Sequence, residues 1–190
     1  MDFNRSVALG LLSAFAVTAC TGPAAHPPPP LGQVVDGHRT TPQDPGRTAA
    51  RDPDAEALDA VTRTHGGAGP WVVAGYRMGV FALAKLGLSQ GSRDLEVRHE
   101  SPAEVQFSCV ADGAQAATGA SLGKLNLTHA VVPRADVKTV YRKKSTGETL
   151  VLRPSRSFVS RFENVPRERL GQAGREVLHL PDADVFEEVK

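Results

Sequence analysis

The fold is decided by the stretch CVADGAQAATGASLGKLN, residues 109–126. We expect its first half, 109–118, to form a helix that follows a short strand. Asp112 and Gln115 lie three residues apart and share one face of this helix, with Cys109 one turn earlier on the same stripe. A plain surface face would rarely include the cysteine, and a plain core face would rarely include the aspartate. The three side chains therefore form the centre of a candidate binding site.

The predicted place of Cys109 at the start of this helix bears on its reactivity. The partial positive charge of a helix N-terminus lowers the pKa of a thiol and favours the thiolate. The chain has two cysteines, and Cys109 is the one expected inside the folded domain, where it has no disulfide partner. The alternative interpretation is a buried small side chain without reactivity.

A glycine-rich loop, THGGAGP at residues 64–70, places His65 between two predicted helices. The first helix is indicated by Asp52 as the capping residue, Pro53 at the first position and acidic residues in the first turn. Glycine ends this helix directly after the histidine. Polar groups held by glycines at the ends of elements are typical of a binding site.

A second helix is predicted from Pro70 to about Leu86, with Gly87 closing it. Apolar residues occur nearly all round it, which predicts burial on most faces. Gly75 and Gly79 are four residues apart, which indicates that another backbone packs closely against one side, or that this side lines a cavity. The helix is charged, short and rich in glycine, so it is not expected to span a membrane.

The remaining elements complete an α+β pattern. A helix is expected near Pro166, and alternating or apolar runs predict strands at Leu95–Glu100, Val105–Phe107, Ala130–Val132, Val137–Arg142 and Thr149–Leu152. The first two runs are either two short strands or one strand interrupted at Pro102. The last two strands read as a hairpin. The order helix, helix, strand, helix, hairpin, helix differs from a regular βαβ repeat and is typical of an α+β domain.

Composition and motifs exclude several function classes. The net charge of +1 argues against a nucleic-acid-binding surface. The segment GASLGKL, residues 119–125, departs from a phosphate-binding loop in its glycine spacing and in having leucine where serine or threonine would bind magnesium. Lys124 in this segment either contacts an anionic ligand or is a solvated loop residue. No serine-hydrolase or zinc-ribbon motif is present in the sequence.

The N-terminal part predicts delivery to a membrane. Residues 1–20 have a basic residue, a short apolar run and the ending VTAC, which resembles a bacterial lipobox with Cys20 as the lipidated residue. An ordinary cleaved secretory signal is the alternative. Residues 21–51 form a proline-rich tether that cannot bury enough apolar surface to fold. We therefore expect an extracytoplasmic domain at 52–190, anchored by lipid on the periplasmic face of a bacterial membrane or on the outer membrane.

Several of these motifs together resemble the FmdE-like family, which takes its name from formylmethanofuran dehydrogenase. The resemblance covers about 65–186 and is carried by the histidine loop, GYRM at 75–78, the block 109–126 and LPDADVF at 180–186. It implies helices packed on a small mixed or antiparallel sheet, a homodimer, and a metal-associated cleft lined by the histidine loop and the cysteine helix.

The chain departs from the family pattern, HGHxCPG, in the loop. Gly67 and Gly69 stand where that pattern has the second histidine and the cysteine, and the C-terminal zinc finger of some members is absent. The predicted metal ligands are therefore His65 and Cys109. The predicted ligand-binding residues are Cys109, Asp112, Gln115, Thr118 and Lys124. Zinc, another transition metal or a metal tetrapyrrole are the candidate cofactors.

Three functions fit these residues. The first is a membrane-tethered protein that binds a metal ion or metal-containing cofactor through His65 and Cys109. The second is an enzyme in which Cys109 is a thiolate nucleophile and His65 its base. The third is a dimeric interaction module with a vestigial site. No catalytic residue is assigned by the sequence alone, and no nucleic-acid partner is expected.

Overall fold

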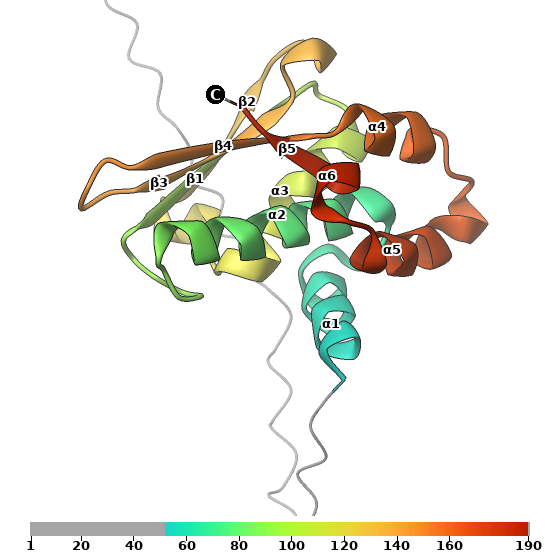
Figure 1. The fold of residues 1–190 in the computed structure, drawn as a ribbon, viewed down its shortest axis with the longest axis horizontal. Helices are drawn as coiled ribbons and strands as arrows, with labels where there is room; N and C mark the ends of the chain where they lie inside the picture. Colours follow the sequence, from blue (N-terminus) through green and yellow to red (C-terminus); the bar gives the residue numbers. More distant parts are fainter. Residues whose placement is uncertain (1–51, 190) are drawn as a thin grey trace, which may run out of the picture. The chain divides into compact units, whose positions relative to one another are not determined.

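A computed structural model describes residues 52–189 of the chain. The predicted signal segment and tether, with Cys20, lie outside these residues. The elements follow in the order α1 Pro53–His65, α2 Pro70–Leu86, β1 Leu95–Ser101, α3 Val105–Thr118, β2 Leu127–Val131, β3 Lys138–Lys143, β4 Thr149–Pro154, α4 Arg156–Phe162, α5 Leu170–His179, α6 Asp182–Val185 and β5 Phe186–Glu188 (Figure 1). Within 52–189, no helix is both long and apolar enough to cross a membrane.

The five strands form one mixed sheet in the order β2-β1-β3-β4-β5, which confirms the α+β class. β1 and β2 are parallel and the other neighbours are antiparallel. A parallel pair needs a crossover connection, and α3 supplies it. α2 and α3 lie together along one face of the sheet, while α4, α5 and α6 gather beyond one end (Figure 1).

The ends of the first two helices are as predicted. The Asp52 carboxylate accepts a hydrogen bond from the Asp54 amide at 3.1 Å, which caps α1. Gly66 ends α1 at φ 85° and Gly87 ends α2 at φ 62°, both in the left-handed region that favours glycine. The two caps fix the loop that carries the candidate site between α1 and α2.

Helices α2 and α3 pack with their backbones in contact. A Cβ atom on Gly75 would lie 2.2 Å from the Val110 carbonyl oxygen, and one on Gly113 would lie 1.9 Å from the Val72 carbonyl oxygen. At Gly79 a Cβ would lie 2.7 Å from a side-chain carbon of α3. The predicted close packing at Gly75 and Gly79 is confirmed, and Gly113 is the partner glycine that the pattern did not single out.

The prediction of a strand at Val105–Phe107 is wrong, because these residues form the first turn of α3. Pro102 directly follows β1, and three alternating residues are too few to form a strand without a partner. Phe107 is buried as a helix residue, with its ring 4.8 Å from that of Trp71. As a consequence Cys109 is the fifth residue of the helix rather than its first.

A buried histidine holds the start of α3 against the sheet. The His99 Nε2 donates to the Phe107 carbonyl oxygen at 3.1 Å, so in the neutral ring Nδ1 accepts from the Thr139 hydroxyl at 2.9 Å. Burial lowers the pKa of His99 to about 4, and the ring is therefore neutral at pH 7. This contact fixes the helix that carries the predicted site residues.

The C-terminal elements include a helix and a strand that were not predicted. α4 begins at Ser155, whose hydroxyl accepts from the Phe158 amide at 3.1 Å, and β5 pairs with β4. Arg77 of α2 donates to the carbonyl oxygens of Val177 and Leu180, both at 2.6 Å. This arginine thus holds the end of α5 against the helix pair.

Adding a methyl group where the two helices touch should destabilise the whole domain. Gly113→Ala would force a Cβ into backbone atoms of α2 that cannot move away without separating the helices. We expect a loss of about 3 kcal/mol or more in the free energy of unfolding, measured by urea denaturation. Gly123→Ala is the matched control, because a Cβ added there would have no atom within 4 Å, and it should change the stability by less than about 0.5 kcal/mol. Equal stability of both variants would contradict the close packing.

Candidate functional site

An open cleft of about 720 Å³ lies where α1 ends and α2 begins, and we call it the His65 cleft. The loop 66–69 forms one side of it, the first two turns of α3 form another, and the chain between α4 and α5 closes it. His65 and Cys109 both line this cleft, together with the largely apolar residues Trp71, Val105, Phe162, Val165 and Leu170. The two predicted metal ligands, His65 and Cys109, therefore meet in one cavity.

His65 and Asp112 form a hydrogen-bonded pair across α1 and α3. The distance from His65 Nδ1 to Asp112 Oδ2 is 2.8 Å, and the two side chains are 24% and 46% exposed. An ionised carboxylate can only accept hydrogen bonds, so the proton lies on Nδ1. In the neutral ring Nε2 then keeps its lone pair for a ligand in the cleft. A carboxylate behind a histidine is the arrangement that orients metal-binding imidazoles.

Cys109 is half-buried, and its thiol is protonated at neutral pH. Burial raises its pKa to about 11, and the negative charge of Asp112 adds to the shift. The predicted lowering of this pKa is therefore wrong. It assumed a place at the helix N-terminus, where the helix charge would act, whereas the residue lies one turn further along, in an apolar wall and beside a carboxylate.

Gln115 lies on the same side of α3 as Asp112 but does not line the His65 cleft. Both residues line a smaller hollow of about 210 Å³ between α3 and β2, together with Ser108 and His129. A hydrogen bond of 2.8 Å joins His129 Nε2 to the Ser101 hydroxyl. Asp112 thus stands between the two cavities, and Gln115 extends the polar surface away from the cysteine.

Two predicted residues lie at the opposite end of α3. The Thr118 hydroxyl is buried and donates to the Ala114 carbonyl oxygen at 2.6 Å, and Lys124 Nζ donates to the Gly119 carbonyl oxygen at 2.7 Å. Thr118 lies nine positions after Cys109 on the helix, which is about 13 Å along the axis. The structure does not bring Thr118 and Lys124 to the His65 cleft, and their contacts close the C-terminal end of α3.

Asn126 completes that closing arrangement. Its amide donates to the Leu95 carbonyl oxygen at 3.1 Å and its oxygen accepts from the Ser121 amide at 3.0 Å. The loop after α3 is thereby tied to β1. The second half of the informative stretch thus makes these contacts at the end of α3, while Cys109 in the first half lines the His65 cleft.

The cleft contains residues that the sequence did not indicate. Trp71 is the single tryptophan of the chain, and its indole donates to the Phe162 carbonyl oxygen at 2.9 Å. Because Trp71 directly follows Pro70 and the glycine loop, the sequence could have indicated that it lines the cleft. Arg167 also lines the cleft, but it comes from a segment about 100 residues further along, and nothing in the pattern connects the two.

The donor atoms do not form a complete metal site. Among residues 52–189, no group of three or more histidine, cysteine, aspartate or glutamate side chains is placed to hold a metal ion. A structural zinc site needs four such ligands and a catalytic one needs three. The His65 cleft offers an imidazole and a thiol, and it fits only a metal whose remaining ligands come from elsewhere.

The comparison with known families finds a match over the part of the chain that forms the cleft. Residues 64–187 match the family model described as FmdE, Molybdenum formylmethanofuran dehydrogenase operon. No curated protein matches the chain. The matched region begins just before His65 and ends in β5, so it includes every wall of the cleft.

The raised pKa of Cys109 has a kinetic consequence. In a chain carrying Cys20→Ser, so that Cys109 is the single thiol, alkylation by iodoacetamide at pH 7.5 should be about 10- to 100-fold slower than for a free thiol. The rate should keep rising tenfold per pH unit beyond pH 9, because the thiolate accumulates only towards pH 11.

Asp112→Asn is the matched variant, since it removes the negative charge and should speed alkylation at a given pH. A rate that levels off below pH 8 in the parent chain would contradict this description of the thiol. The urea-unfolded chain should react like a free thiol and serves as the control for reagent quality.

Proposed function

This chain belongs to the FmdE family, and we propose that it is a binding protein whose His65 cleft takes up a metal-containing cofactor. The observation that carries the proposal is the pairing of an oriented imidazole and a thiol in one cavity of ligand size. The family is associated with the operon of a metal-dependent dehydrogenase, which favours a metal over a purely organic ligand.

The imidazole is the principal protein ligand in this proposal. Asp112 holds the Nδ1 proton of His65, so that Nε2 is the nitrogen free to bind. Cys109 supplies a second, softer donor from the neighbouring helix. Because its thiol is protonated at neutral pH, binding of sulfur to a metal would release a proton and would strengthen as the pH rises.

The small number of protein donors decides what kind of metal species fits. Two donors hold a bare ion weakly, whereas a cofactor that carries most of the metal's ligands needs only one or two from the protein, as tetrapyrroles do. A cleft of about 720 Å³ with aromatic and aliphatic walls suits the organic part of such a cofactor. Arg167 offers a positive charge for an acidic group on it.

The enzyme hypothesis receives less support. A nucleophilic cysteine needs a substantial thiolate fraction near neutral pH, and burial with a neighbouring carboxylate works against it. His65 is hydrogen-bonded to Asp112 through Nδ1, so only Nε2 could accept a proton from the Cys109 thiol. The residue types for a cysteine–histidine mechanism are present, but the electrostatics favour a neutral thiol.

We propose further that the domain acts as a homodimer at a membrane surface. The lipobox at Cys20 and the proline-rich tether support the anchoring, and the family resemblance supports the dimer. In this arrangement the folded domain would carry its cofactor on the outer side of a bacterial membrane, held by lipid chains rather than by a spanning helix.

The cofactor should be detectable in the purified protein. The Cys20→Ser chain, prepared without chelator or immobilised nickel, should contain a transition metal or a visible chromophore at one per chain or one per dimer, by elemental analysis and absorption spectroscopy. His65→Ala and Cys109→Ser should each lose it, since only two protein donors are available. His179→Ala is the matched control, because this histidine is exposed on α5 and its loss should leave the content unchanged.

A folded chain that is colourless and metal-free, and that takes up neither added zinc nor added haem, would overturn the proposal. Retention of full metal content in both site variants would overturn the assignment to the His65 cleft.

The anchor is tested separately. When the full chain is produced in a bacterial host, detergent phase partitioning should place it in the detergent-rich phase, and Cys20→Ser should move it to the aqueous phase. Cys109→Ser should partition like the parent, because this half-buried thiol lies within the folded domain. Aqueous partitioning of the parent chain would show that the N-terminal segment is an ordinary secretory signal.

A further inference from the structure

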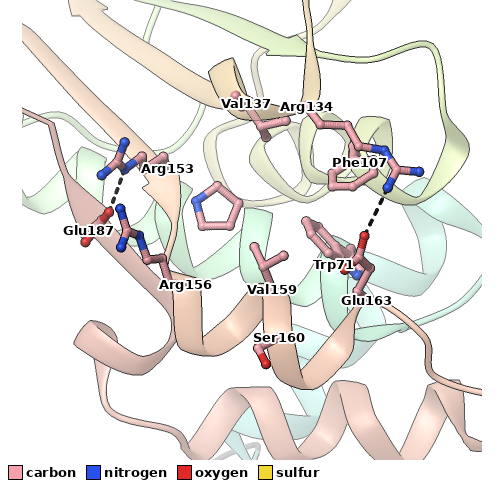
Figure 2. A pocket seen from close by; sticks show the side chains of 12 residues that line it. Trp71, Phe107, Arg134, Val137, Arg153, Arg156, Val159, Ser160, Glu163 and Glu187 are labelled. Atoms are coloured by element: carbon pink, nitrogen blue, oxygen red, sulfur yellow. Dashed lines mark hydrogen bonds and ion pairs between the residues drawn. The ribbon is translucent and has the colours of Figure 1, made fainter.

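A second cavity lies on the other side of Trp71, and we propose that it binds a small organic monoanion with a flat apolar body. The cavity has a volume of about 540 Å³ and lies between α4, β4 and the turn before β3 (Figure 2). We call it the arginine pocket, after Arg134, Arg153 and Arg156, which line it together with Trp71 and Phe107. None of the predicted site residues belongs to it.

The inner wall of the arginine pocket is apolar and rigid. Trp71 and Phe107 pack edge to face at 4.8 Å and are both about 4% exposed. The Trp71 indole is held by the Phe162 carbonyl oxygen, so the ring cannot turn out of the wall. Val159 and Val137 flank the rings (Figure 2). Together with the half-buried Val159, the rings give the pocket a fixed apolar floor against which an apolar group can rest.

Two of the three arginines are already neutralised. Arg134 forms ion pairs with Glu104 and with Glu163, the latter at 3.1 Å, and its guanidinium lies 5.2 Å from the centre of the Phe107 ring. Arg153 Nε donates to Glu187 at 2.6 Å. In Figure 2 the Arg134–Glu163 pair lies at one end of the pocket and the Arg153–Glu187 pair at the other.

Arg156 is the third arginine of the pocket and has no ion-pair partner among residues 52–189. It is exposed at the start of α4. Figure 2 places it beside Arg153, so that two guanidinium groups lie at the same end of the pocket as a single glutamate, Glu187. A carboxylate bound there would receive charge-assisted hydrogen bonds from Arg156 and from the unengaged nitrogens of Arg153.

The unpaired arginine and the apolar wall together select the ligand class. Arg134 and Arg153 are paired with glutamates, so the pocket offers one guanidinium without an ion pair, that of Arg156, to one negative charge on the ligand. A polyphosphate would meet two glutamates and too few free cations. A neutral apolar molecule would leave Arg156 unused. An aromatic or similarly flat carboxylate satisfies both the wall and the guanidinium, and the volume lies within the usual range for small-ligand sites.

The experiment uses 2-naphthoate as the probe and its uncharged counterpart 2-naphthamide as the comparison. Both are titrated into the full Cys20→Ser chain by isothermal titration calorimetry. The naphthoate should bind at one per chain and at least tenfold more tightly than the amide. Arg156→Ala should weaken naphthoate binding about tenfold and leave amide binding unchanged, while Arg156→Lys should recover part of the loss.

Three variants locate the binding. Ser160→Glu adds a negative charge at an exposed lining position and should abolish naphthoate binding without disturbing the fold. Arg175→Ala removes an equally exposed arginine on α5, outside the pocket, and should have no effect. His65→Ala alters the other cleft and should also have no effect.

Several results would overturn the proposal. One is equal affinity of naphthoate and amide, and another is the absence of any binding up to millimolar concentration. Weakening by Arg175→Ala as large as that by Arg156→Ala would show that only general surface charge is involved. Loss of binding in His65→Ala, with Arg156→Ala unaffected, would assign the probe to the His65 cleft instead.

Discussion

The contact on which the rest of the structure depends is the backbone-to-backbone packing of α2 on α3. Gly75 and Gly113 leave no space for a side chain between the helices, and each glycine lies against a carbonyl group of the other helix. This separation brings the second turn of α3 up to the loop that precedes α2. With larger residues at the crossing the two halves of the His65 cleft would lie further apart, and His65 could not reach Asp112.

Within that frame, Asp112 acts on its two neighbours in different ways. It holds the proton of His65 on Nδ1 and so prepares the opposite nitrogen to bind. The same negative charge, added to burial, keeps the Cys109 thiol protonated. One carboxylate therefore leaves Nε2 of His65 with a free lone pair and keeps the Cys109 thiol protonated at neutral pH. Such a division suits a protein that binds a cofactor better than one that attacks a substrate.

The sequence predicted those parts of the fold whose signals are local. The caps at Asp52, Gly66 and Gly87 are set by residues within one turn, and they place α1 and α2 correctly. β5 was missed because its position depends on pairing with β4, and α4 was missed although Ser155 carried a capping signal. The residue types of the site were found from their spacing, but the partnership of His65 with Asp112 joins positions 47 residues apart. The direction of the Cys109 pKa shift was missed because it depends on where the helix begins and on what covers the thiol.

The distribution of buried residues along the chain has a further consequence for the His65 cleft. α2 buries most of its length, whereas α1 buries only Ala57 and Val61 and leaves its polar face in solvent. Helices with few buried apolar residues open at a lower free-energy cost than the body they rest on. His65 lies at the last position of this lightly held helix, and Cys109 lies on the firmly held α3. The two donors thus belong to parts of unequal stability, and local opening of the cleft is expected to begin at α1 rather than at α3.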